Sequence, residues 1–289
     1  MLGTYHLTAL FDILNRIHFL YEPEKLWQLV LENACKTLQS DAGAFYEIAD
    51  DEQALNVKAA YGVEVKHLAK APFKVGTGVC GWVAQFQQPT IVNDVRQDNR
   101  FNRAIDHQTG FLTKSILCIP VFSTKKNYGV LEVLNKKAGQ FTAQDQEFMT
   151  LLSRQAAIAY QNLLLMAEIS HKQVLLDSLL QNLSGGLIAI DQASCITILN
   201  PASRQLLKLN VNGGGLGKSS VEILKDYPWM VETIQKTLQT QSTVSRQETQ
   251  LLVGGETQKF GYTTILIADH DKKVLGAGII FQKLASNPT

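Results

Sequence analysis

The sequence predicts an α+β fold of two domains, each an antiparallel sheet with flanking helices, joined by a long helix. The chain has 289 residues, of which 45% are hydrophobic and 18% charged, which suits a globular protein with room for two domains. Apolar, β-branched runs occur on both sides of one long helical tract. This tract, residues 142–183, contains neither glycine nor proline. We therefore place a first domain at 1–165, a connecting helix at 166–184 and a second domain at 185–289.

Two helices are predicted at the start of the first domain. In the first helix, apolar residues recur at helical spacing, at Leu7, Leu10, Phe11, Leu14 and Ile17. The second helix begins near Pro23, which suits a first helical turn. Its predicted buried face comprises Leu26, Trp27, Val30, Ala34 and Leu38.

Five strands are expected in the first domain, at residues 43–49, 54–61, 90–92, 114–122 and 128–135. Glycines in the segment before the third strand suggest tight turns and a close helix start. The last two strands are long and antiparallel, so they expose a wide sheet face. Helices or a bound small molecule must cover that face.

The long tract exceeds the length that one small domain can cover. It opens with Thr142 and Asp145, which have the spacing of a capping box. Alternating steps of four and three residues are typical of a coiled-coil seam and favour a homodimer through the 142–183 helix. The seam comprises Phe148, Leu152, Gln155, Ala159, Asn162, Met166, Ile169, Gln173, Leu176, Leu180 and Leu183.

Two features of the tract bear on how it pairs. A buried Asn162 would weaken a dimer but favour one register, because its amide needs a partner across the seam. Leu151, Ile158 and Leu165 form another stripe that could face the first domain. The alternative to a dimer is a helix, or two helices, simply packed on the sheets.

The second domain shows a different order of elements. Two short strands around residues 186–199 precede a helix with Asn200 as its cap and Pro201 in its first turn. A helix near 229–238 follows. Three long strands at about 243–253, 257–268 and 273–283 then complete the predicted sheet.

A spaced motif in the first domain carries a family resemblance. The segment TGFLTKSILCIP, which begins at Thr109, is followed by Asn135, Lys136, Phe141 and Asp145. This pattern resembles the GAF domains of cyclic-nucleotide phosphodiesterases and cyanobacterial adenylyl cyclases. Gln146 stands where that family has glutamate.

The resemblance implies a small ligand held between the sheet and its covering helices. The implied contacts are Val79 and Cys80 near a phosphate, Phe101 at the wall, Asp106, Thr109 and Thr113 along the lid, and Glu132 on the second long strand. It also implies that Lys136 and Asp145 pair to lock the lid without touching the ligand.

Two departures from the family bear on the ligand. Gly43 stands where some members have a hydroxyl, and Tyr61-Gly62 stands where guanine-binding members have an aromatic residue followed by an acid. Without that acid the guanine N–H edge lacks an acceptor, which costs about 1–3 kcal/mol. We therefore expect cAMP rather than cGMP as the ligand. A GAF domain that binds nothing and only dimerises stays an open alternative.

The second domain has a resemblance of its own. Asp191 follows its first strand, Asn200, Pro201 and Ala202 follow its second, and the last strand reads GAGIIFQKL. This pattern resembles the PAS domains in front of bacterial sensor-kinase cores. Together the two resemblances imply a sensory module that relays a signal through a dimer helix to an output domain outside this chain. The implied parent is a histidine kinase or, second, a nucleotide cyclase.

Composition excludes several other classes of function. The formal net charge is +1 without a basic stripe, which argues against a nucleic-acid partner. The longest apolar runs are too short to span a bilayer and the first residues lack signal-peptide features, so we expect a cytoplasmic protein without membrane contact. Four cysteines and six histidines show no metal-ligand spacing. We therefore expect no metal centre and no catalytic site, and interpret the cysteines as reduced, buried apolar residues.

Overall fold

The computed structural model describes residues 4–17, 22–68, 73–123, 126–210 and 214–284. They form two compact units, Met1–Ile169 and Ser170–Thr289. Each unit contains one five-stranded sheet in which every strand pairing is antiparallel. This confirms the prediction of two antiparallel sheets flanked by helices.

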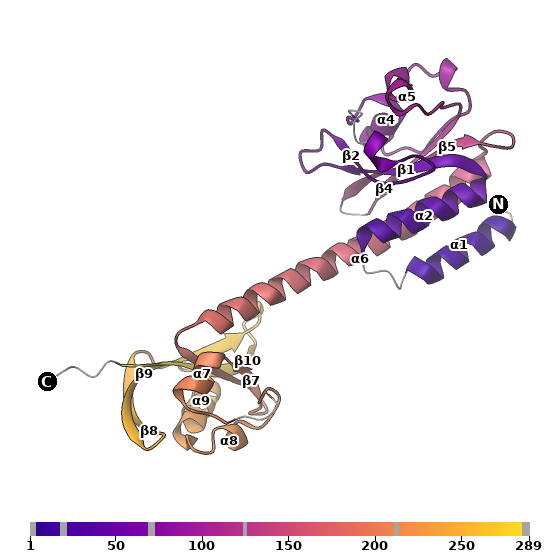
Figure 1. Cartoon of the computed structure of the whole chain (residues 1–289). Helices are drawn as coiled ribbons and strands as arrows, with labels where there is room; N and C mark the ends of the chain where they lie inside the picture. The colour runs from indigo at the N-terminus through magenta and orange to yellow at the C-terminus, as the bar shows by residue number, and fades with distance from the viewer. Residues whose placement is uncertain (1–3, 18–21, 69–72, 124–125, 211–213, 285–289) are drawn as a thin grey trace. The chain divides into compact units, whose positions relative to one another are not determined.

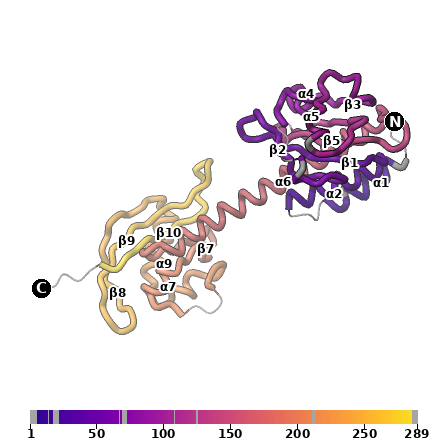
Figure 2. Tube along the Cα trace, turned by 45° about the horizontal axis from the view of Figure 1, so that its top comes forward, coloured from indigo at the N-terminus to yellow at the C-terminus, as the bar shows by residue number. Residues whose placement is uncertain are grey.

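The sheet of the first unit lies between two groups of helices (Figures 1 and 2). Its strand order is β2-β1-β5-β4-β3. Helices α1, α2 and α6 cover one face, and α3, α4 and α5 lie on the other. The elements are α1 (Thr4–Ile17), α2 (Pro23–Leu38), β1 (Ser40–Ile48), β2 (Leu55–Tyr61), α3 (Val65–Leu68), α4 (Gly78–Phe86), β3 (Thr90–Val92), a 3-10 turn (Val95–Gln97), α5 (Arg103–Thr109), β4 (Ile116–Phe122), β5 (Asn127–Lys136) and α6 (Ala143–Asn182).

Strand alternation divides the interior of this unit into two apolar cores. Along β1, Phe45 packs in the core beneath α1, α2 and α6, whereas Ala42, Ala44 and Tyr46 belong to the core beneath α4. The predicted face of α2 is confirmed, because all five of its residues are at most 1% exposed. Trp27 on that face stacks on Phe45 with ring centroids 3.6 Å apart.

The predicted face of α1 is partly wrong. Ile13 and Ile17 are buried in the core, but Leu7 is 41% exposed and Phe11 64% exposed. Several stripes at helical spacing compete on this short apolar helix. The position of α2 beside it selects the stripe that carries Ile13 and Ile17.

The stripes predicted on the long tract also need correction. Phe148 and Leu152, placed in a dimer seam, are fully buried in the core of the first unit. Ile158 and Leu165, placed against that unit, are 52% and 48% exposed. The face of α6 that packs on the sheet comprises Asp145, Phe148, Met149, Leu152, Ser153, Ala156, Ala157, Tyr160 and Leu163. Phe148 and Leu152 are therefore not available for contacts with a second chain.

The second unit follows the predicted order of elements. It contains β6 (Gly186–Asp191), β7 (Ile196–Leu199), α7 (Pro201–Leu206), α8 (Ser220–Ile223), α9 (Pro228–Thr240), β8 (Gln247–Val253), β9 (Glu256–Ala268) and β10 (Val274–Lys283). The strand order is β7-β6-β10-β9-β8. One apolar core, which includes Ile188, Met230 and Phe281, joins α9 to the sheet.

Asn200 is the N-cap of α7 and Pro201 occupies its first turn, as predicted. The Asn200 side chain also ties the helix to the start of β6. Its Oδ1 accepts hydrogen bonds from the Leu187 and Ser203 amides at 2.8 and 3.0 Å, and its Nδ2 donates to the Gly185 carbonyl at 2.9 Å.

Among the described residues, no helix combines the length and the apolar character that a bilayer span requires. This holds for the 40-residue α6 as well.

Candidate ligand cavity and its cover

The first unit contains a cavity of about 70 Å³ between its sheet and α3, α4 and α5. Strands β1, β4 and β5 supply its floor through Ala42, Ala44, Ile116 and Leu134. All seven residues expected to contact a ligand line this cavity: Val79, Cys80, Phe101, Asp106, Thr109, Thr113 and Glu132. The structure thus brings together side chains from four separate segments of the chain.

The first turn of α4 forms one side of the cavity. Thr77 is its N-cap but makes no side-chain capping bond, and Val79 and Cys80 follow directly. Backbone N–H groups and the positive end of the helix dipole therefore lie at the cavity wall. Such a helix start favours a negatively charged group.

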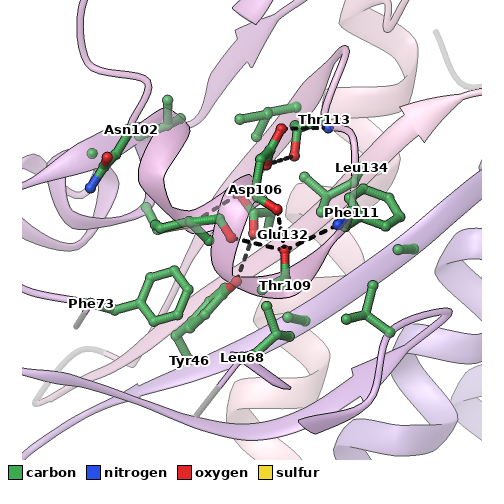
Figure 3. A pocket seen from close by; sticks show the side chains of 18 of the residues that line it. Tyr46, Leu68, Phe73, Asn102, Asp106, Thr109, Phe111, Thr113, Glu132 and Leu134 are labelled. Carbon is green, nitrogen blue, oxygen red and sulfur yellow. Dashed lines mark hydrogen bonds between the residues drawn. The ribbon is translucent and has the colours of Figure 1, made fainter. Parts of the chain in front are cut away.

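Helix α5 and the segment after it form the cover of the cavity (Figure 3). The Asp106 carboxylate accepts hydrogen bonds from the Thr113 amide at 2.8 Å and from its hydroxyl at 2.7 Å. The Thr109 hydroxyl donates to the Ile105 carbonyl at 2.9 Å and accepts from the Phe111 amide at 3.3 Å. The polar groups of the cover are thus already bonded to one another.

Glu132 occupies a buried position on β5, with 6% exposure. The Tyr46 hydroxyl donates to its Oε2 at 2.9 Å, and the Cys80 thiol donates to its Oε1 at 3.0 Å. A carboxylate on a strand has to point to water or find hydrogen-bond donors in the protein, because burying it without partners is costly. Glu132 finds donors in the protein.

Burial shifts the titration of this group and its neighbours. Desolvation raises the pKa of Glu132, while the hydrogen bonds from Cys80 and Tyr46 act in the opposite direction. The hydrogen bond with Cys118 and burial together raise the pKa of the Cys80 thiol well above its usual value. Burial likewise raises the pKa of Cys118 and of Tyr46. The cluster thus resists carrying several negative charges at once.

Asn135 and Lys136, two adjacent residues of the spaced motif, hold different parts of the unit. The Asn135 Oδ1 accepts from the Lys114 amide at 2.7 Å, and its Nδ2 donates to the Leu112 carbonyl at 2.8 Å. These bonds fix the segment after α5, which belongs to the cover. Lys136 instead reaches the start of α6, where its Nζ lies 2.5 Å from Asp145 Oδ2.

The two departures from the family pattern have a structural explanation. A Cβ at Gly43 would lie 2.9 Å from Cys35 Sγ and 3.2 Å from a Leu31 methyl group, which belong to the core on the opposite face of the sheet. A hydroxyl at position 43 would therefore point away from the cavity. Gly62 has a φ of +74°, and a Cβ there would lie 2.1 Å from the Asp41 carbonyl oxygen, so this backbone accommodates no acidic side chain.

Sequence reasoning assigned no role in the site to three residues that shape it. Tyr46 lines the cavity and holds Glu132, Cys118 lies beneath it, and Asn135 fixes its cover. Tyr46 shares a sheet face with Ala42 and Ala44, and all three line the cavity. Cys118 and Asn135 both belong to the motif that carries the family resemblance, but their partners lie far away in the chain, so local sequence did not reveal their roles.

Comparisons with known proteins agree with this architecture. A family model described as a GAF domain matches residues 22–161. The dual 3',5'-cyclic-AMP and -GMP phosphodiesterase 11 of Drosophila melanogaster is 29% identical over 185 residues, covering 57% of this chain and 12% of that protein. The probable 3',5'-cyclic phosphodiesterase pde-5 of Caenorhabditis elegans is 29% identical over 124 residues, covering 43% and 16%. The chain thus spans only 12% and 16% of the length of these relatives.

Solved structures of low sequence identity also match part of this chain. The GAF domain of a phosphoenolpyruvate-protein phosphotransferase from Coxiella burnetii has a TM-score of 0.49 and 20% identity, over 60% of this chain and 98% of that one. The second GAF domain of DevS from Mycobacterium smegmatis has a TM-score of 0.41 and 23% identity, over 53% and 99%. The family model and its residue range identify the segment: residues 22–161 of this chain form a GAF domain.

Proposed function

We propose that the GAF domain senses a small ligand in its cavity and that this ligand is a cyclic nucleotide, cAMP before cGMP. One observation carries the proposal: all seven residues expected to contact a cyclic nucleotide line one cavity. A relative named as a dual cyclic-AMP and cyclic-GMP phosphodiesterase supports it, because its similarity extends over this domain. The domain acts as a regulatory module, and no step of catalysis is assigned to it.

The size of the cavity sets a condition on binding. At about 70 Å³ it is smaller than typical ligand pockets of roughly 300–1,000 Å³. A nucleotide therefore enters only when the cover moves outward. The bonds of Thr113 with Asp106 and of Asn135 with residues 112–115 are the ones that this movement strains or breaks.

The preference for cAMP follows from the acceptors in the cavity. The guanine N–H edge needs an acidic or carbonyl acceptor, and Gly62 supplies no side chain. The two carboxyl groups that line the cavity, Asp106 and Glu132, already accept hydrogen bonds from protein donors. Guanine presents N1–H and N2–H2 donors side by side and would have to break one of these bonds to find acceptors for both. Adenine presents one donor group, N6–H2, beside the N1 acceptor, and so requires fewer acceptors.

A titration of the full chain with each nucleotide tests this proposal. We expect cAMP to release or absorb heat with one site per chain and to raise the melting temperature, with cGMP weaker. Thr109→Val should weaken cAMP binding about tenfold, because a lost hydrogen bond in a closed site costs roughly 1–1.5 kcal/mol. Thr240→Val is the matched control, since Thr240 also ends a helix and donates to the carbonyl four residues earlier, but in the second unit.

Absence of heat and of any melting shift with both nucleotides would overturn the cyclic-nucleotide proposal. That result would favour the second candidate function, a ligand-free dimerisation and interaction module. The observation that favours this candidate is the small cavity, whose polar lining groups bond to one another.

The relay is the second part of the proposal. We infer that α6 pairs with α6 of a second chain and that the second unit, a PAS domain, passes the change to an output domain, a histidine kinase or else a nucleotide cyclase. Large apolar side chains stay exposed on α6 beyond its buried segment, at Leu164, Leu165, Met166, Ile169, Val174, Leu175, Leu176 and Leu179. Such a concentration on one helix favours pairing.

A substitution in this exposed stretch tests the pairing. Leu176→Lys should convert a dimer into a monomer, because a lysine in a helix seam is desolvated without a partner. Leu252→Lys is the control, since Leu252 is also a highly exposed leucine but lies on β8. Light scattering over a range of concentrations measures the mass. A wild-type chain that stays monomeric at the highest concentration contradicts the relay.

A further inference from the structure

Three metal-ligating side chains converge beneath the cavity, although 38 residues separate the two cysteines among them. Cys80 comes from the first turn of α4, Cys118 from β4 and Glu132 from β5. Cys118 and Glu132 face each other in the β4–β5 register. The two sulfurs and a carboxylate oxygen all lie within 4.8 Å of one another, and all three residues are buried. Sequence spacing alone gave no sign of this cluster.

The distances fit a tetrahedral metal ion. The Cys80 and Cys118 sulfurs are 3.7 Å apart. Two thiolates bound to one zinc ion at about 2.3 Å with tetrahedral angles lie about 3.8 Å apart. The sulfur of Cys80 lies 3.0 Å from Glu132 Oε1, so the same oxygen reaches the ion with a small side-chain rotation. A disulfide needs a much shorter sulfur separation of about 2.05 Å.

The surroundings support the same three ligands. The Tyr46 hydroxyl holds Glu132 Oε2, which leaves Oε1 directed at the sulfurs, as an outer partner orients a metal ligand. Two thiolates and a carboxylate repel one another in a buried site, and a divalent cation removes that repulsion.

We propose that Cys80, Cys118 and Glu132 bind a zinc ion at the floor of the GAF cavity. Cys80 and Glu132 line the cavity, so the fourth coordination position opens into it and takes water or a donor atom of a small molecule. Binding replaces the thiol protons of both cysteines, and the carboxyl proton where it is present, and these protons go to solvent. The site does not depend on a cyclic nucleotide, and it goes beyond the ligand proposed above.

Metal titration of the reduced, chelator-treated full chain tests the site. With Zn²⁺ we expect one ion per chain, measured by competition with a coloured chelator. With Co²⁺ we expect the absorption bands of a tetrahedral ion with two thiolate ligands. Because the measurement uses wild-type protein without nucleotide, it succeeds or fails independently of the cAMP titration.

Variants assign the ligands. Cys118→Ser should weaken Zn²⁺ binding by more than about 100-fold and halve the sulfur-to-cobalt band, and Tyr46→Phe should weaken binding by about tenfold. Cys35→Ser is the matched control, because Cys35 is also a buried thiol but packs in the core on the opposite face of the sheet. Melting curves check that each variant is folded.

Several results would overturn the site. Wild-type protein that is folded and reduced but shows no thiolate-to-cobalt band carries no such metal centre. An equal loss of binding in Cys35→Ser places the metal elsewhere. A mass spectrum that shows Cys80 and Cys118 joined as a disulfide under the same reducing conditions also contradicts the metal site, because a disulfide leaves no thiolates to bind the ion.

Discussion

Lys136→Met should destabilise the GAF domain by about 3–5 kcal/mol, the cost of leaving a buried charge without its partner. The Asp145 side chain is 4% exposed and that of Lys136 16% exposed. Asp145 also accepts hydrogen bonds from the amide and the hydroxyl of Thr142 at 2.7 and 3.0 Å. It therefore cannot turn toward water without breaking these bonds at the start of α6. Methionine keeps most of the length of the lysine side chain and removes its charge and its hydrogen bond to Asp145.

Urea unfolding of the full chain, followed by tryptophan fluorescence, measures this loss. Trp27 and Trp82 report the first unit and Trp229 the second, so single-tryptophan backgrounds separate the two transitions. Lys25→Met is the control, because the pair of Lys25 with Glu22 is 63% and 57% exposed. Such a surface pair contributes less than about 1 kcal/mol.

The double variant Lys136→Met with Asp145→Asn separates charge from packing. Asparagine keeps an acceptor for Thr142 but carries no charge, so the double variant should recover a large part of the lost stability. Equal losses in Lys136→Met and Lys25→Met would show that the buried pair contributes no more than a surface one. A fall in affinity for any cavity ligand together with stability would extend the role of the pair to the cover.

Asn200→Ala should destabilise the second unit by about 3 kcal/mol. Asn200 is 3% exposed, and its side chain forms hydrogen bonds with the amides of Leu187 and Ser203 and with the carbonyl of Gly185. Alanine removes the cap of α7 and leaves buried backbone groups without partners, each at a cost of about 1–3 kcal/mol before relaxation. Hydrogen exchange of β6 and α7 should rise, while the GAF domain keeps its protection.

Asn102→Ala is the matched control for this change. Asn102 caps α5 in the same way, through its Oδ1 and the Ala104 amide, but it is exposed and makes a single bond of this kind. Its loss should therefore cost only about 1 kcal/mol. Asn200→Asp keeps the acceptor and loses the donor, so an intermediate stability is expected. If Asn200→Ala and Asn102→Ala lower stability equally, the buried hydrogen bonds of Asn200 contribute no more to stability than a simple helix cap.

Local patterns predicted the elements of both units because they are properties of neighbouring residues. The strands, the buried face of α2 and the Asn200–Pro201 helix start all follow from spacing and capping within a few residues. The buried faces of α1 and α6 were predicted less well. Each of these helices carries more than one apolar stripe, and the choice between stripes depends on which elements pack against the helix.

The cavity was predicted through family resemblance rather than through spacing. Val79, Asp106 and Glu132 come from different elements, and only the closed sheet brings them together. Gly43 shows that a family pattern cannot always be carried over position by position. A side chain at this position would point into the core on the other face of the sheet and not into the cavity. The fold likewise brings Cys80 close to Cys118, and local sequence patterns cannot predict this contact because 38 residues separate the two cysteines.

Asn135 and Lys136 are adjacent residues of β5 that contact two different parts of the first unit. Asn135 hydrogen-bonds to the segment after α5, which belongs to the cover of the cavity, and Lys136 forms an ion pair with Asp145 in the first turn of α6. Asn135 adopts a left-handed backbone with φ of 57°, a conformation that asparagine tolerates better than most residues. A single dipeptide of β5 therefore contacts both the cover of the cavity and the start of the long helix.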